Sequence, residues 1–142
     1  MFVYLDTSSL VKLYVEEGGS FKVETLVESA EFTATSIVAY AEARAAFSRR
    51  FREKAFTQKE YNLIRKSFDK DWGSYLILNV TGDTIRLAGN LAEKHALRGF
   101  DSIHLASAII LRRELSLPVA FSCFDENLQK VSEREGLDQG QH

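Results

Sequence analysis

The sequence predicts an α/β fold, a single three-layer domain in which helices flank a central parallel β-sheet. Short apolar runs of strand length alternate with amphipathic stretches of helix length from one end to the other. The only proline, Pro118, stands at the start of such a run, where it costs no ladder hydrogen bond. No segment rich in Gly, Ser or Pro interrupts the chain, so we expect one domain over residues 1–142.

The N-terminal part of the chain supplies two strands and two short helices. Phe2–Leu5 is an apolar run typical of a strand buried on both faces. Phe32–Thr35 is a weaker strand candidate, because two threonines dilute it. Between these strands, Leu10–Val15 and Phe21–Glu28 have helical character, and a pair of glycines separates them.

Residues 36–71 are expected to form a helical hairpin. Ser36 can cap a helix that runs to about Lys54. Thr57 and Glu60 have the spacing of a capping box, which opens a second helix ending near Asp71. Six aromatic side chains in this hairpin predict either a partner-binding surface or an aromatic core inside it: Phe47, Phe51, Phe56, Tyr61, Phe68 and Trp72.

The C-terminal half continues the alternation of strands and helices. We expect strands at Leu76–Val80 and Val119–Phe124. Three helices are expected: one that Gly99 ends, one that Asp101 starts, and a last one over about Glu126–Glu135. The polar tail, residues 138–142, is expected to fray.

Composition and charge narrow the class of protein. Apolar residues make up 45% and charged residues 27%, and no run approaches the roughly 20 apolar residues of a membrane helix. The single cysteine, Cys123, cannot form an internal disulfide, and the start of the chain lacks the basic region of a signal peptide. We therefore expect a cytoplasmic protein that does not enter a membrane.

The net charge of −2 argues against a protein that coats nucleic acid permanently, since such proteins are basic. An enzyme that contacts nucleic acid briefly can be acidic overall if its charge is uneven. Arg44, Arg49 and Arg50 belong to a basic run that either guides phosphate groups or forms a solvated helix face.

Four acidic residues are candidates for a shared site. Asp6 and Asp125 follow the first and last predicted strands, at the edge where open α/β sheets bind ligands. Asp101 stands at a helix start, and each of the three aspartates could instead cap the helix after it. Glu42 differs, because its helical neighbours three and four residues away are all alanine or valine. Its carboxylate is therefore expected to face the buried side, where it binds either a metal or a distant Arg or Lys. The alternative is a Glu exposed at the margin of the helix.

Carboxylates that share a pocket repel one another and are stabilised by a hard divalent cation. Ligation by oxygen alone suits Mg²⁺ or Mn²⁺, and such ions activate water and polarise phosphate, so phosphodiester hydrolysis is the expected reaction. Ser8 could hold a metal-bound water, and Ser8, Arg44 and Arg49 are candidates to contact substrate. His95 and His104 are weaker candidates, although His104 lies one helical turn beyond Asp101.

Four segments together resemble the PIN-domain ribonucleases, and within them the VapC toxins of toxin–antitoxin pairs. They stand in the family's order at Val3–Lys12, Ala39–Arg44, Gly99–Ala106 and Phe124–Leu128. The resemblance implies a PIN-like parallel sheet, endoribonuclease activity on RNA, a homodimer, and a cognate antitoxin that blocks the site. It also implies that Mg²⁺ or Mn²⁺ is bound by Asp6, Glu42, Asp101 and Asp125. The family often has Ser or Thr where this chain has Cys123, and Asp125 ranks last among the four acids.

Three other functions fit part of the pattern. A PIN-like nuclease could process RNA outside a toxin–antitoxin system. A receiver-like domain or small phosphatase would need a lysine after a strand, whereas Lys12 and Lys130 lie on predicted helices. A pure interaction module with four capping acids would leave the apolar surroundings of Glu42 unexplained.

Overall fold

A parallel sheet of five strands runs through the centre of the computed structural model, which describes residues 1–139. The strand order is β3-β2-β1-β4-β5, and every pairing is parallel. The strands are β1 (Phe2–Leu5), β2 (Phe32–Ser36), β3 (Leu76–Leu78), β4 (Val119–Ser122) and β5 (Asp138–Gln139). The parallel sheet expected from the sequence is therefore confirmed.

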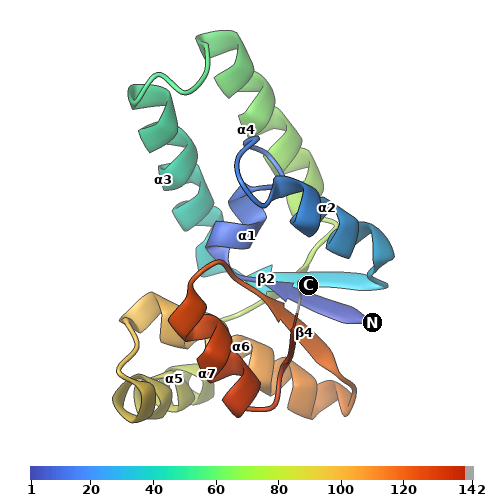
Figure 1. Cartoon of the computed structure of the whole chain (residues 1–142), viewed down its shortest axis with the longest axis vertical. Coiled ribbons are helices and arrows are strands. Elements are labelled where there is room, and N and C mark those ends of the chain that lie inside the picture. The colour runs from blue at the N-terminus through green and yellow to red at the C-terminus, as the bar shows by residue number, and fades with distance from the viewer. Residues whose placement is uncertain (140–142) are drawn as a thin grey trace.

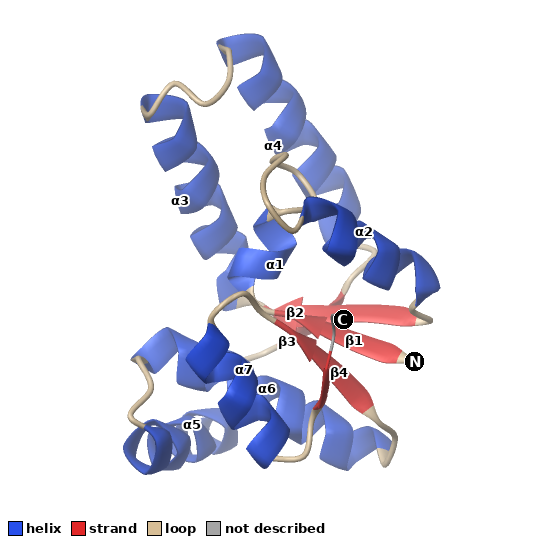
Figure 2. Ribbon diagram, in the orientation of Figure 1, coloured by secondary structure: helices blue, strands red, loops and turns tan. Residues whose placement is uncertain are grey.

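Helices cover both faces of the sheet, which gives the three predicted layers (Figures 1 and 2). Side chains alternate along β1, so Val3 and Leu5 face one layer and Tyr4 faces the other. The first layer contains α1 (Thr7–Val11), α2 (Ser20–Ser29), α3 (Val38–Arg52) and α4 (Gln58–Trp72). The second contains α5 (Gly82–His95), α6 (Gly99–Leu115) and α7 (Glu126–Arg134). No helix within residues 1–139 is long and apolar enough to cross a membrane.

The hairpin formed by α3 and α4 extends away from the sheet (Figure 1). The predicted capping box is present, since the Thr57 hydroxyl and the Glu60 carboxylate each accept the other residue's backbone amide. Phe47 and Phe68 are fully buried, with ring centroids 5.3 Å apart, and Tyr14 packs against both. Phe47 and Phe68 therefore belong to an aromatic core. Phe51, Phe56 and Tyr61 stack on one another and are only half-buried, so a partner-binding surface remains open for them.

The first helix begins earlier than the sequence suggested. Instead of a helix over Leu10–Val15, α1 starts directly after Asp6, whose carboxylate accepts the backbone amide of Ser9 at 3.0 Å. Such a cap starts the helix as soon as the strand ends. The expected cap of the hairpin is also displaced, because Ser36 belongs to β2 and Ile37 is the N-cap residue of α3.

The boundary between α5 and α6 differs from the prediction. Ala96, rather than Gly99, takes the left-handed conformation after α5, with φ of 54°. This turn directs Leu97 onto the hydrophobic core, which offsets the backbone cost. Gly99 is the first residue of α6, so Asp101 lies in the first turn of that helix and is not its N-cap.

The end of the described chain is more ordered than expected. Asp138 and Gln139 pair with Ala120 and Phe121 of β4, so this part of the predicted frayed tail is a strand. The amide of Gln129 donates to the side chain of Gln139 at 2.7 Å. The remaining predicted tail, residues 140–142, lies outside the described residues.

Candidate active site

The ends of β1 and β4 and the first turn of α6 bring the three aspartates into one neighbourhood. β1 and β4 are adjacent, and the backbone amide of Asp6 donates to the carbonyl of Ser122 at 3.1 Å. Cys123 follows β4 and is buried among these acids. Burial first, and then the charges of Asp6, Asp125 and Asp101, raise the pKa of the Cys123 thiol to about 12. The negative charges of all three aspartates therefore act on this position.

Asp6 both caps a helix and belongs to the acidic neighbourhood. Its side chain is buried, and Oδ1 accepts the backbone amide of Ser9 at 3.0 Å and the Ser8 hydroxyl at 2.7 Å. Burial raises the pKa of Asp6, and Asp101 adds to this, although His104 and the two hydrogen bonds oppose it. Capping and site formation are thus compatible roles for the same carboxylate.

Glu42 on α3 is half-buried, as its apolar neighbours predicted, and its partners are not Lys or Arg. Oε1 accepts the Thr7 hydroxyl at 2.6 Å and lies 2.9 Å from Nε2 of His104. Burial disfavours the charged form, but the hydrogen bonds from His104 and Thr7 outweigh it and lower the pKa of Glu42. Glu42 is therefore ionised and fixed in place.

His104 is the residue that sequence reasoning undervalued. Its side chain is only 3% exposed, and Nδ1 lies 2.7 Å from the hydroxyl of Tyr4 on β1. Its Nε2 lies 2.9 Å from Glu42 Oε1, so His104 connects β1 to Glu42. The available signal was helical spacing, since residues 101 and 104 share one face of α6. That signal could not reveal the Tyr4 contact, which joins residues 100 positions apart.

The other two acids are more open. The Asp101 side chain is 24% exposed, and Oδ2 lies 3.3 Å from Nε of Arg98. Asp125 is exposed and caps α7 by accepting the backbone amide of Leu128 at 2.8 Å. Within residues 1–139, no three His, Cys, Asp or Glu side chains meet closely enough to enclose a metal ion. The donors are oxygens suited to a hard cation, but side chains must move to complete a ligand shell.

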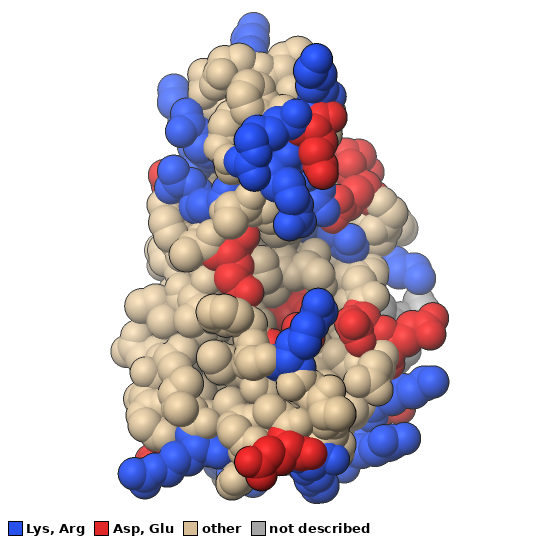
Figure 3. All heavy atoms as spheres, turned by 90° about the vertical axis from the view of Figure 1, so that its left-hand side faces the viewer, with Lys and Arg blue, Asp and Glu red and all other residues tan. Residues whose placement is uncertain are grey.

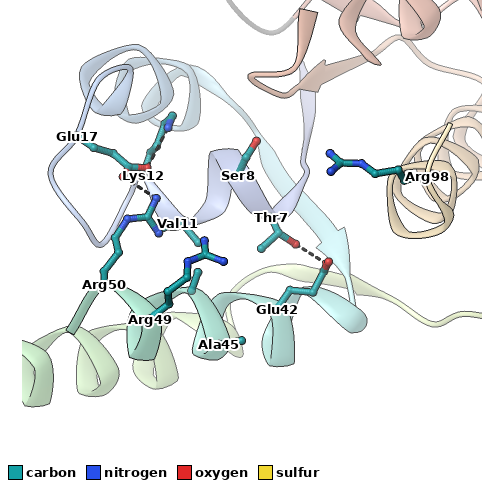
Figure 4. Close-up of a pocket in the computed structure, with 11 residues that line it drawn as sticks. Thr7, Ser8, Val11, Lys12, Glu17, Glu42, Ala45, Arg49, Arg50 and Arg98 are labelled. Atoms are coloured by element: carbon teal, nitrogen blue, oxygen red, sulfur yellow. Dashed lines mark hydrogen bonds and ion pairs between the residues drawn. The ribbon is translucent and has the colours of Figure 1, made fainter. Parts of the chain in front are cut away.

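A cleft of about 480 Å³ opens beside Glu42, between α1, α3 and the start of α6 (Figure 4). Thr7, Ser8 and Glu42 lie on its floor, and the guanidinium groups of Arg49 and Arg98 point toward it from opposite sides. Basic side chains gather over the hairpin on this face of the molecule, with acidic groups below them (Figure 3). Such a cleft can bind a phosphate backbone on one side and present carboxylates to it on the other.

Two further cations line the cleft but are neutralised within the chain. Lys12 Nζ lies 2.9 Å and Arg50 Nη2 lies 2.8 Å from the carboxylate of Glu17. Arg44 lies elsewhere, in a hollow of about 360 Å³ on the hairpin, where Nη1 donates to the Tyr40 hydroxyl at 2.8 Å. Of the residues predicted to contact substrate, Ser8 and Arg49 line the cleft and Arg44 does not.

The sequence matches the PIN domain family over residues 3–134. The chain belongs to this family. Two curated relatives, ribonucleases VapC45 and VapC49 from two strains of Mycobacterium tuberculosis, are each 36% identical over 107 residues. Each alignment covers 75% of this chain and 74% of the relative. The receiver-like and pure interaction interpretations are thereby set aside.

Solved structures with the same fold extend over almost the whole chain. VapC20 from M. tuberculosis, described as a toxin that cleaves the sarcin-ricin loop, has a TM-score of 0.69 and covers 99% of both chains. For FitAcB from Neisseria gonorrhoeae the TM-score is 0.65, and the match covers 96% of this chain and 95% of the FitAcB chain. For VapBC2 from Rickettsia felis, bound to a DNA fragment from its promoter, the TM-score is 0.62, and the match covers 92% of this chain and 93% of the matched chain. Each is 15% identical to this chain, so these likenesses concern the fold.

Proposed function

We propose that this protein is an endoribonuclease that acts as the toxin of a toxin–antitoxin pair and hydrolyses RNA with Mg²⁺ or Mn²⁺. The observation that carries the proposal is that Glu42 lines a cleft flanked by Arg49 and Arg98, next to Thr7, which directly follows Asp6 at the end of β1. Membership of the PIN family and the ribonuclease relatives support the same reaction.

The metal would be held by Asp6, Asp101 and Glu42, with Asp125 the most dispensable of the four acids. A bound Mg²⁺ or Mn²⁺ would supply an activated water and polarise the phosphate. The buried Asp6 supports this assignment, because burial and the nearby Asp101 charge raise its pKa and a cation would relieve that cost. Glu42 is ionised and therefore ready to accept a cation or orient a water.

The RNA backbone would lie in the cleft between Arg49 and Arg98. A guanidinium group donates two parallel hydrogen bonds to a phosphate, so two of them on opposite walls would hold consecutive phosphates. The Ser8 and Thr7 hydroxyls would lie beneath the scissile phosphate, next to the carboxylate of Glu42. We propose a cytoplasmic location, because that is where the RNA substrate would be met.

An antitoxin would inhibit the enzyme by covering this cleft, and two copies of the chain would form the active dimer. The two-component VapBC2 neighbour and the family relatives support a protein partner. A PIN nuclease that processes RNA without an antitoxin is the alternative. A stable complex with the product of an adjacent small gene would favour the toxin over that alternative.

The test is cleavage of single-stranded RNA by the purified protein. We expect activity with Mn²⁺ or Mg²⁺, none with EDTA, and little with Ca²⁺, whose larger and more flexible shell positions water less well. Asp101→Asn should lower the rate by at least about 100-fold, more than outer-shell changes usually cost. Asp83→Asn is the matched control, since Asp83 occupies the first turn of α5 as Asp101 does that of α6. Full cleavage in EDTA would contradict the metal mechanism.

A further inference from the structure

A buried imidazole connects the core of the sheet to the cleft. His104 Nδ1 lies 2.7 Å from the hydroxyl of Tyr4, which is fully buried. On its other side, Nε2 lies 2.9 Å from Glu42 Oε1 and 3.1 Å from Thr7 Oγ1. His104, on α6, thus connects Tyr4 on β1 to the carboxylate of Glu42, which lines the cleft.

The partners determine where the imidazole proton lies. A carboxylate oxygen accepts hydrogen bonds, and Nε2 lies 2.9 Å from Glu42 Oε1, so Nε2 is the ring nitrogen that carries a proton in this contact. Nδ1 is then the acceptor, and the Tyr4 hydroxyl is the donor that it needs. Tyr4 therefore selects the tautomer that points an N–H at Glu42.

Both donors meet Glu42 at the same atom. Thr7 donates to Oε1 at 2.6 Å, and Nε2 of His104 approaches the same oxygen. Within residues 1–139, every hydrogen bond recorded for this carboxylate falls on Oε1. Both contacts hold the carboxyl group by this one oxygen, and Glu42 lines the cleft (Figure 4).

We propose that His104 is a positioning residue for the nuclease, which holds Glu42 by Oε1 so that Oε2 is presented to the divalent ion. This inference rests on the proposed function. Tyr4 contributes by fixing the tautomer of His104, and neither residue touches RNA or metal. Outer-shell partners that orient a ligand usually change metal affinity or activity by about 10–100-fold when they are removed.

The test is a double-mutant cycle between His104→Leu and Glu42→Gln, measured on Mn²⁺ affinity by calorimetry and on RNA cleavage. His104→Leu alone should weaken Mn²⁺ binding and lower kcat by about 10–100-fold. Its effect on KM, and on RNA affinity in EDTA, should be small, because His104 is buried beneath the cleft. In the Glu42→Gln background, His104→Leu should add almost nothing, since it acts through Glu42.

His104→Gln is the conservative variant, because its amide can place an N–H near the position of Nε2. We expect it to recover most of the Mn²⁺ affinity lost in His104→Leu. Tyr4→Phe keeps the packed ring and should lose part of the affinity, which gives a second measurement if His104→Leu does not fold. Melting temperatures in EDTA identify variants that are merely unfolded.

Two results would overturn the proposal. Equal losses from His104→Leu in the parent and Glu42→Gln backgrounds would show that His104 acts independently of Glu42. Equal losses from His104→Leu and His104→Gln would show that the donated hydrogen bond is irrelevant. If the parent protein binds Mn²⁺ and cuts RNA, either result removes only the positioning role of His104. If the parent protein binds no Mn²⁺, the proposed metal mechanism is overturned as well.

Discussion

Replacing Asp6 by Asn should stabilise the metal-free protein. Asn caps helices as well as Asp does, so the side-chain oxygen can still accept the backbone amide of Ser9. The variant removes the charge of a residue that is only 6% exposed. A tenfold change in the proton affinity of a carboxyl group is worth about 1.4 kcal/mol, and relief of the buried charge is expected to contribute about that much. Loss of the charged contact to the helix end costs about 0.5 kcal/mol.

The net gain of about 1 kcal/mol corresponds to a rise in melting temperature of about 4 °C for a chain of this size. Because burial raises the pKa of Asp6, the folded protein holds this proton more tightly than the unfolded chain does. The parent therefore loses stability as pH rises through the raised pKa, and recovers it on acidification. The advantage of Asp6→Asn should be full at pH 7 and should disappear toward about pH 4, where the unfolded carboxyl is protonated.

We would follow thermal unfolding by circular dichroism in EDTA and in Mn²⁺, from pH 4 to pH 8. Asp125→Asn is the matched control, because Asp125 makes the same cap contact on α7 but is exposed. It should melt at the parent's temperature or slightly below. Mn²⁺ at about 100 times its dissociation constant should add about 2.7 kcal/mol to the parent and far less to Asp6→Asn. An Asp6→Asn variant that melts below the parent in EDTA, yet responds fully to Mn²⁺, would refute the reasoning.

Two predictions concern the cations of the cleft. Arg49→Ala should weaken binding of single-stranded RNA and reduce the slope of log affinity against log salt concentration by about 0.7. Arg44→Ala is the control, since Arg44 is on the same helix but outside the cleft, and it should change the affinity and the slope much less. Filter binding at several salt concentrations measures this, and equal effects of the two variants would place the RNA elsewhere. Glu17→Gln should strengthen RNA binding and steepen the slope, because it frees Lys12 and Arg50 from their ion pairs. Unchanged binding would mean that these two cations do not face RNA.

Much of the fold was predictable because it depends on local patterns. Apolar runs gave the buried strands, and the spacing of Thr57 and Glu60 gave the start of α4, which forms as predicted. The errors fall at helix ends, such as α5, where Ala96 takes a left-handed conformation that local preference assigns to glycine. There Leu97 packs against the hydrophobic core, and this contact accompanies the left-handed conformation of Ala96. Such packing is not visible in the local sequence.

The sequence by itself determined which residues carry negative charge to the ends of β1 and β4, because Asp6 directly follows β1 and Asp125 stands in the short turn between β4 and α7. It also placed Glu42 on the inner side of its helix. Only the tertiary structure decided the partners. The order of the strands and the packing of α6 bring His104 between Tyr4 and Glu42, which lie in segments far apart along the chain. A hydrogen bond needs atoms within about 3 Å, and a spacing rule along one helix or strand cannot specify a distance between two of them.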